Sequence, residues 1–298
     1  MKKITAIGEI LFDVYEDKKS LGGAPFNFIY HVMKLTGQGN FISKIGDDEP
    51  GEEIRQFFNR KKLPVNYLQT DKIHKTGIAK TALNAQKVPT FSIEENCAYD
   101  FIESSEELES LMNDETDCLY FGSLAQRNEV SKGTIRKLFS LAPTKFCDLN
   151  LRQNFYSKDV IEESLYTADI VKLNSDELNV VSSMINKNNF SLIDLIESLI
   201  SRFSIELLCV TDGENGATLV NKNYESDQRK LNITNVVDTV GAGDAYAAIL
   251  CIGYLNKMEL KDINKIANEF AGEIVKVKGA LPPDDTIYDK YKEFLIDE

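Results

Sequence analysis

The sequence predicts an α/β fold with a mainly parallel sheet and helices on both faces. Short apolar or β-branched runs recur along the 298 residues, and segments with helical periodicity lie between most of them. No internal repeat or low-complexity linker interrupts this alternation. Alternating strands and helices build βαβ units, in which helices cover both faces of a parallel sheet. The length allows an ample core, and we expect one domain over residues 1–298.

Short runs of apolar and β-branched residues are expected to form the strands. They are, in chain order, residues 4–7, 40–45, 118–121, 145–149, 170–173 and 207–211. Segments with apolar residues at helical spacing are expected to form the helices, including residues 26–35, 133–141, 160–167, 192–203 and 245–255. The segment 245–255 is apolar throughout, which predicts a buried or half-buried helix.

Two stretches, residues 9–20 and about 64–103, do not fit this alternation. The second alternates like a hairpin, with strands at 76–83 and 90–94 and Lys87, Val88 and Pro89 at the connection. We interpret both stretches as a small β-sheet lid over the crevice at the strand ends. A lid could exclude water from a ligand that is bound in the crevice. A plain edge hairpin is the alternative.

The formal net charge of −13 argues against a nucleic acid or an anionic membrane as the main partner. ATP needs only a local positive field, so it stays compatible with this charge. No apolar stretch reaches the roughly 18 residues of a membrane span, and Glu9 and Asp13 interrupt the apolar run after Lys2 and Lys3. We therefore expect neither an export signal nor a membrane span, and a cytoplasmic location.

Cysteine and histidine usage argues against zinc chemistry and against a histidine-driven hydrolase. The chain has five cysteines, none in a C-x-x-C pair, and two histidines. Most of the cysteines lie in apolar runs, which predicts reduced core residues: Cys118, Cys147, Cys209 and Cys251.

The motif D-T-V-G-A-G-D at residues 238–244 lies between a β-rich run at 232–237 and the apolar helix. Gly241 and Gly243 lack a Cβ, so a ligand can approach the backbone closely. The amides of the first helical turn have no intrahelical partner, and together with the helix dipole they make an anion hole. Asp244 inside that hole suits a base that accepts a proton from a hydroxyl while the amides hold a phosphoryl group. The alternative is that Asp244 merely caps the helix.

A second glycine-rich segment lies near the N-terminus. G-E-I-L-F-D at residues 8–13 is followed by G-G-A-P-F-N at residues 22–27, which opens an amphipathic helix. This helix start also presents backbone amides as hydrogen-bond donors. The two motifs add the side chains of Asp13, an acceptor, and Asn27, an amide, but no cationic side chain. This combination suits the hydroxyls of a neutral polyol better than a phosphate.

Together these two motifs resemble the signatures of the ribokinase/fructokinase family of sugar kinases. Five further stretches occur in the order expected of that family: I-G-D-D-E-P-G (45–51), C-D-L-N-L-R (147–152), K-L-N-S-D-E (172–177), V-T-D-G-E-N-G (210–216) and A-N-E-F-A-G-E-I-V-K-V-K-G-A (267–280). The resemblance covers essentially the whole chain and implies a ribokinase-like fold with a β-sheet lid.

The resemblance also implies roles for individual residues. Asp244 resembles the catalytic base, and Gly241, Ala242 and Gly243 resemble the anion hole. The residues that resemble sugar ligands are Asp13, Gly22, Gly23 and Asn27. Arg152 corresponds to an arginine near the reacting groups, which could bind phosphoryl oxygens or a substrate carboxylate.

The remaining matches concern the nucleotide and the cations. Asn174 and Glu177 match an N-x-x-E motif that helps to position phosphate and hydrated Mg²⁺, although a helix start with an acidic first turn would look the same. Residues that match the nucleotide-binding loop and a position beside the adenine are Thr211, Gly213, Gly216 and Asn268. Asp238 and the carbonyl of Val240 match a monovalent-cation site. The implied cofactors are ATP, Mg²⁺ and K⁺.

The substrate is a less direct inference. Residues 76–84, 89–102 and 120–127 resemble the fructokinase branch, which favours D-fructose phosphorylated at its 6-hydroxyl. Arg152 leaves 2-keto-3-deoxygluconate as the alternative, and a nucleoside is less expected because no aromatic clamp for a base is identified. A non-catalytic sugar-sensing protein is disfavoured because the base and the glycines are present. A Rossmann oxidoreductase is disfavoured because the dinucleotide fingerprint is absent.

Two residues depart from the family pattern, and the quaternary state is open. Tyr246 replaces a common Phe, and Asp212 places a carboxylate near the expected nucleotide phosphates. The apolar alternation of the lid would permit a homodimer through it.

Overall fold

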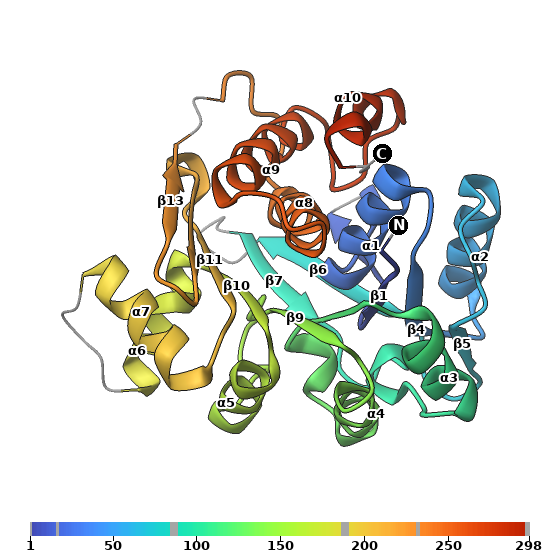
Figure 1. Ribbon diagram of the computed structural model, residues 1–298. Helices are drawn as coiled ribbons and strands as arrows, with labels where there is room; N and C mark the ends of the chain where they lie inside the picture. The colour runs from blue at the N-terminus through green and yellow to red at the C-terminus, as the bar shows by residue number, and fades with distance from the viewer. Residues whose placement is uncertain (1, 16–17, 84–88, 186–190, 231–232, 296–298) are drawn as a thin grey trace.

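A computed structural model describes residues 2–15, 18–83, 89–185, 191–230 and 233–295. Its main sheet has nine strands among these residues, in the order β13-β12-β11-β10-β9-β8-β1-β4-β5 (Figure 1). The strands are β1 (Ile4–Ile7), β4 (Asn40–Gly46), β5 (Leu68–Asp71), β8 (Cys118–Phe121), β9 (Thr144–Asp148), β10 (Ile170–Asn174), β11 (Leu207–Thr211), β12 (Ala217–Asn221) and β13 (Ser226–Arg229). All pairs from β5 to β11 are parallel, and β12 and β13 add an antiparallel hairpin at one edge. The predicted mainly parallel sheet is confirmed.

Helices cover both faces of the sheet (Figure 1). The helices of one layer are α1 (Ala24–Thr36), α2 (Glu49–Lys61), α8 (Ala242–Leu255), α9 (Leu260–Ile274) and α10 (Thr286–Leu295). The helices of the other layer are α3 (Glu106–Glu115), α4 (Glu129–Phe139), α5 (Lys158–Thr167), α6 (Ser175–Met184) and α7 (Leu192–Phe203). Alternate strand residues enter the two cores, as Tyr120 and Phe121 of β8 do. Asn128 and Ser157 cap α4 and α5, which therefore begin earlier than their apolar periodicity predicts.

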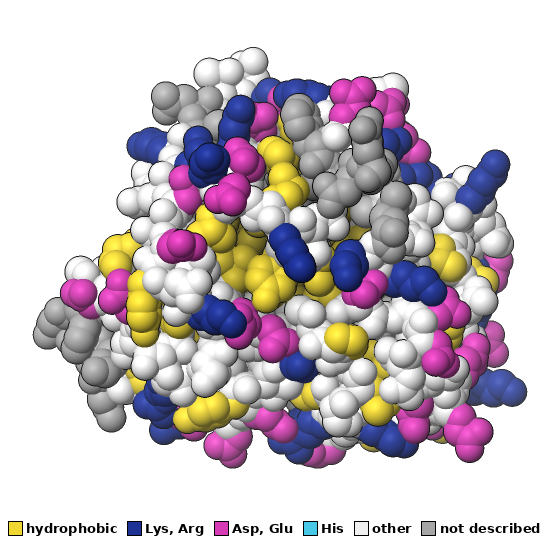
Figure 2. Space-filling model, viewed as in Figure 1, with side chains coloured by type: hydrophobic (Ala, Val, Ile, Leu, Met, Phe, Trp, Pro, Cys, Tyr) yellow, Lys and Arg dark blue, Asp and Glu magenta, His cyan; other side chains and the backbone are white. Residues whose placement is uncertain are grey.

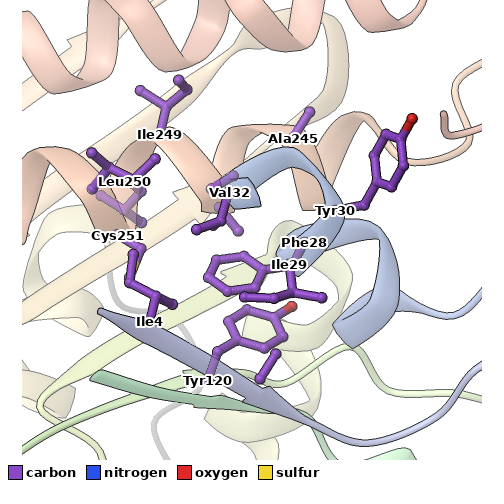
Figure 3. Close-up of a cluster of buried hydrophobic side chains, with 14 of the residues drawn as sticks. Ile4, Phe28, Ile29, Tyr30, Val32, Tyr120, Ala245, Ile249, Leu250 and Cys251 are labelled. Carbon is purple, nitrogen blue, oxygen red and sulfur yellow. The ribbon is translucent and has the colours of Figure 1, made fainter. Parts of the chain in front are cut away.

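Helix α8 is buried on all sides, as its composition predicts. Figure 3 shows Ile249 and Leu250 of α8 beside α1, from which Phe28 points toward Tyr120 of β8. The rings of Phe28 and Tyr120 stack with their centroids 3.7 Å apart. Helix α8 packs against α1 and α9 in this core. These contacts fix the position of the N-terminus of α8.

A second sheet of four strands forms the predicted lid, in the order β3-β2-β6-β7. Its strands are β2 (Leu11–Tyr15), β3 (Lys18–Gly22), β6 (Gly77–Leu83) and β7 (Pro89–Ile93). Of the predicted hairpin connection, Lys87 and Val88 lie outside the described residues, and Pro89 begins β7.

The lid is smaller than the predicted range 64–103. Residues 68–71 form β5, which pairs with β4 in the main sheet instead. Residues 98–101 form a 3-10 helix whose residue Tyr99 is buried with Leu11 of β2 and Ala79 of β6. Local alternation could not distinguish lid strands from an edge strand of the main sheet, because both have the same period.

Of the predicted β-rich run at 232–237, Asn232 lies outside the described residues, and residues 233–237 do not form a strand. The last strand, β13, ends at Arg229, and residues 233–237 have no regular structure. Val236 and Val237 are exposed, and the amides of Val237 and Asp238 donate to the carbonyl of Val275 at the end of α9. Without a neighbouring strand, β-branched residues alone do not make a strand.

Two expectations from composition can be compared with the fold. All five cysteines are buried and free, including the four predicted to be reduced core residues. Among the helices that the structure describes, none combines the length and apolarity that a membrane crossing requires.

Candidate active site

Two cavities meet at the carboxyl ends of the parallel strands, where α/β folds bind ligands. The first, of ≈ 690 Å³, lies between the main sheet and the lid, and Leu11, Ala79 and Ile93 contribute its lid side. The second, of ≈ 610 Å³, extends toward α9. The residues that line both are Thr211, Thr239 and Gly243, so the cavities join beside the start of α8. Figure 2 shows a hollow near the middle of one face, with hydrophobic side chains in it and charged side chains around it.

The start of α8 presents backbone amides at this junction. Gly241 is the N-cap residue with φ of 80°, and a Cβ there would lie 2.6 Å from Cα of Ala280. Both the left-handed backbone and the close approach require glycine. Ala242 lines the second cavity, and Gly243 lines both. The structure therefore places the predicted anion hole where the two cavities join.

Asp244 lies in the first turn of α8 and lines the first cavity. Its Oδ2 accepts a hydrogen bond from Nδ2 of Asn27 at 2.8 Å, which joins α8 to α1. Burial and the charge of Asp148 raise the pKa of Asp244 to about 6, against the opposing effects of Asn27, Lys172 and Arg152. The carboxyl group is therefore mostly ionised at pH 7 and can accept a proton.

A buried ion pair, absent from the sequence-based site, lines the first cavity. Lys172 Nζ lies 2.8 Å from Asp148 Oδ2, and both side chains are almost fully buried. The hydroxyl of Tyr120 donates to the same oxygen at 3.1 Å. A Cβ on Gly243 would lie 3.3 Å from Lys172 Nζ, so this ammonium group lies directly beside the anion hole. The signals in the sequence are Lys172, the single charge of the otherwise apolar β10, and Asp148 at the end of β9, because buried charges need partners.

The predicted sugar ligands gather in the first cavity, which is lined by Asp13, Gly23, Asn27 and Arg152. Gly22 does not line it, but a Cβ there would lie 2.6 Å from Asp13 Oδ2. Burial raises the pKa of Asp13 to about 6. Gly22 therefore makes room for the Asp13 carboxyl group, and its role is indirect.

Glu9, at the end of β1, is a further cavity residue that the sequence-based site lacks. Its side chain is buried, and burial raises its pKa to about 7. Gly23, with φ of 111°, lies so close to Glu9 that a Cβ would be 2.5 Å from the Glu9 carbonyl oxygen. In the sequence Glu9 is one charge in an apolar run after a glycine, and no local pattern marks it as a ligand.

Asn174 and Glu177 form a capping box at the start of α6, and they line the first cavity rather than the second. Glu177 Oε2 accepts from the amide of Asn174 at 2.8 Å, and Oε1 accepts from the amide of Leu151 at 2.8 Å. Burial raises the pKa of Glu177. Glu177 thereby joins α6 to the loop that carries Arg152.

The loop around Arg152 has an unusual backbone. Asn150 has φ of 43° and Gln153 has φ of 49°, so two residues without glycine's freedom adopt the left-handed region around Arg152. The side chain of Arg152 is exposed and lines the first cavity. Such strain at a cavity wall is typical of a loop shaped by its function.

The predicted nucleotide residues Thr211, Gly213, Gly216 and Asn268 line the second cavity. Asn268 donates to Oδ1 of Asn264 at 2.7 Å, and the hydroxyl of Tyr246 donates to the same atom at 2.7 Å. Asn268 and Tyr246 thus share one buried hydrogen-bond network, which is centred on Asn264.

The other departure from the family pattern, Asp212, is hydrogen-bonded to its own turn and to the start of α6. Its carboxylate accepts from Ser175 Oγ at 2.7 Å and from Asn215 Nδ2 at 3.0 Å. Asp212 lines neither cavity. These two hydrogen bonds hold the carboxylate away from the space expected for phosphate.

The predicted monovalent-cation residues, Asp238 and Val240, are neighbours in a loop beside α8. Asp238 accepts from the amide of Val240 at 3.1 Å and from the amide of Gly279 at 3.0 Å. Val240 lines the first cavity, and Asp238 does not. In the described part of the chain, no three His, Cys, Asp or Glu side chains gather as a metal site. The cation site remains a prediction.

Comparisons with known proteins agree on one family. A family model described as pfkB family carbohydrate kinase matches residues 1–287. An uncharacterized sugar kinase of Pyrococcus horikoshii is 27% identical over 314 residues, which cover 97% of this chain and 96% of that protein. Its crystal structure has a TM-score of 0.81 at 26% identity and covers 98% of each chain.

Two fructokinases are similar as well. A fructokinase of Klebsiella pneumoniae is 27% identical over 265 residues, which cover 84% of each protein. The structure of a fructokinase double mutant of Vibrio cholerae, with fructose, ADP and a potassium ion bound, has a TM-score of 0.79 at 21% identity. That alignment covers 100% of this chain and 99% of the other, and it is similarity of fold.

Proposed function

This chain belongs to the pfkB family of carbohydrate kinases, and we propose that it transfers the γ-phosphoryl group of ATP to the 6-hydroxyl of D-fructose. It is a phosphotransferase that acts on a sugar hydroxyl. The observation that carries the proposal is the position of Asp244 and Gly243, a base and an anion hole side by side where two cavities join.

The arrangement of side chains suggests how the reaction proceeds. Asp13, Gly23 and Asn27 hold the sugar with its acceptor hydroxyl toward Asp244, which takes the hydroxyl proton. The sugar oxygen forms a bond to the γ-phosphorus as the bond from that phosphorus to the β-γ bridging oxygen breaks, and ADP leaves. The amides at Gly241 to Gly243 and the ammonium group of Lys172 neutralise the negative charge that moves through this space.

The second cavity fits the nucleotide. Ala271 and Val275 give it an apolar wall, and Asn268 adds a polar group, a combination typical of nucleotide-base sites. Because this cavity joins the first one beside Gly243 and the start of α8, we expect the phosphates to lie there.

The donor chemistry also fits Mg²⁺, which proteins usually hold through one or two carboxylates together with water and phosphate. Glu177 and Asp148 line the first cavity beside the junction and would provide these carboxylates. When bound, the ion screens phosphate charge. For K⁺, the proposed ligands are Asp238 and the carbonyl of Val240.

Fructose is favoured over 2-keto-3-deoxygluconate by the cavity as well as by the lid sequence. Carboxyl groups of Glu9, Asp13 and Asp244 line the acceptor cavity, and they would repel a substrate carboxylate. Arg152 is the feature that favours the acid. A non-catalytic sugar sensor would not need a carboxylate beside a cluster of free backbone amides.

The test is ADP formation by the purified protein with ATP, Mg²⁺ and K⁺, against D-fructose, 2-keto-3-deoxygluconate, ribose and adenosine. We expect turnover selective for fructose, with the 6-phosphate identified by ³¹P NMR. Faster turnover of another acceptor would refute the substrate and keep the family chemistry. No turnover of any acceptor by folded protein would refute the catalytic proposal.

The pH dependence follows from the pKa of the base. With a pKa of about 6, Asp244 accepts a proton only when ionised, so kcat/KM should be constant above about pH 8 and fall about tenfold per unit well below pH 6. Asp13, with a pKa of about 6, and Glu9, with a pKa of about 7, line the same cavity, so the profiles of Asp13→Asn and Glu9→Gln separate their contributions. A wild-type profile that stays flat down to pH 5 would contradict the assignment of Asp244 as base.

The single domain over residues 1–298, a homodimer through the lid and a cytoplasmic location stay predictions from the sequence.

A further inference from the structure

We propose that Glu9 determines acceptor specificity by receiving a hydrogen bond from a hydroxyl of the sugar that does not react. This inference rests on the proposed function, because it assigns a role within the acceptor cavity. Glu9 lies at the carboxyl end of β1, far in sequence from Asp244, and lines the same cavity.

The carboxyl group of Glu9 is held at one side and unpartnered at the other. Backbone amides of Glu9 itself and of Ala24 hydrogen-bond to it, which joins the end of β1 to the start of α1. Its Oε2 is buried and has no hydrogen-bond partner among the described residues, and the side chain is 2% exposed. A buried carboxylate oxygen without a donor is destabilising, so it requires an explanation.

A second unpartnered acceptor lines the same cavity. Asn27 uses Nδ2 to bond Asp244, and its Oδ1 is buried without a partner among the described residues. Two acceptors from different elements therefore line one space. A ligand with several hydroxyl donors satisfies both, whereas an inorganic anion would satisfy neither.

The charged side chains around Glu9 restrict which chemical group of a substrate can bind beside it. Asp13 and Asp244 line the same cavity, so a carboxylate at this wall would face like charges. Asp148 is neutralised by Lys172, and both oxygens of Glu177 accept backbone hydrogen bonds. Among the carboxylate oxygens of this wall in the described residues, Glu9 Oε2 is the one that is buried without a protein donor, and a neutral hydroxyl is the group that it can bind.

The test compares wild type with Glu9→Gln on fructose and on its singly deoxygenated analogues. Glutamine keeps the volume and can keep an oxygen toward the amide of Ala24, so only the unpartnered oxygen is exchanged. The assays are run at pH 8.5, where Glu9, with a pKa of about 7, is ionised. For one analogue we expect wild type to lose about 10- to 100-fold in kcat/KM, the effect of a hydrogen bond to a charged group. Glu9→Gln should lose less than about fivefold for the same analogue.

Specificity and a control variant supply the other readouts. Glu9→Gln should raise KM for fructose, leave KM for ATP unchanged and lower the preference for fructose over 2-keto-3-deoxygluconate. Ser43→Ala removes a 2.6 Å hydrogen bond to the carbonyl of Gly8 beside this site. It disturbs the same strand end outside the cavity, and it should shift none of these ratios.

The outcomes separate this inference from the proposed function. Equal deoxygenation losses in wild type and Glu9→Gln at every position would overturn the role of Glu9 while fructose turnover stands. If wild type prefers another sugar, the same comparison with deoxygenated analogues of that sugar decides the role of Glu9. Turnover of no sugar would overturn both.

Discussion

Replacement of Asp244 by Asn is expected to lower kcat by about 10²–10⁴-fold, the usual contribution of a positioned base, while fructose still binds. An amide has nearly the shape of a carboxylate and can keep the hydrogen bond from Asn27, which measures 2.8 Å in the wild type. It cannot take the hydroxyl proton. The measurement is kcat from ADP formation, together with the dissociation constant of fructose by titration calorimetry.

Asp194→Asn is the matched control. Asp194 occupies the same place in α7 that Asp244 occupies in α8, the third residue of the helix, and it accepts a hydrogen bond from Ser191 outside both cavities. Any general effect of removing a first-turn carboxylate should appear in this variant too. If Asp244→Asn kept wild-type turnover, the proton would have to leave by another route, and the assignment of the base would be wrong.

Replacement of Lys172 by Met is the second large effect, and we expect kcat to fall about 10²–10³-fold, as when one group that stabilises the transition state is removed. Methionine nearly matches the length of lysine but carries no charge. The buried Asp148 would then face the phosphoryl space without its counter-ion 2.8 Å away. Uncompensated negative charge there repels phosphate and costs stability as well.

Lys44→Met controls for the loss of stability. Lys44 is a similarly buried lysine, which donates to the carbonyl of Phe101 at 2.9 Å and lies 3.4 Å from Asp71, away from both cavities. Thermal unfolding should show a lower Tm for both variants, while only Lys172→Met loses turnover at a temperature where both are folded. Equal losses of kcat in the two variants would show that Lys172 has only a structural role.

Much of the fold could be predicted because it depends on local pattern. The strands at 4–7, 118–121 and 207–211 and the helix at 192–203 occur with the predicted bounds. Apolar runs of strand length and apolar residues at helical spacing are direct consequences of burial. The failures, the run at 232–237 and the width of the lid, concern segments whose state depends on which strand lies beside them.

In the candidate site, too, some features depend on the local sequence and others depend on long-range packing. The sequence by itself determined that residues 238–244 form a glycine-rich helix start with a carboxylate at Asp244, and it predicted an anion hole there, because such a helix start has a local chemistry. Only the tertiary structure decided which side chains share the space with that loop. Lys172 lies in β10, Asp148 ends β9 and Glu9 follows β1, and it is the parallel order of β1, β8, β9 and β10 that brings the carboxyl ends of these strands to one cavity. A buried charge is recognisable in a sequence, but its partner and its ligand are set by long-range packing.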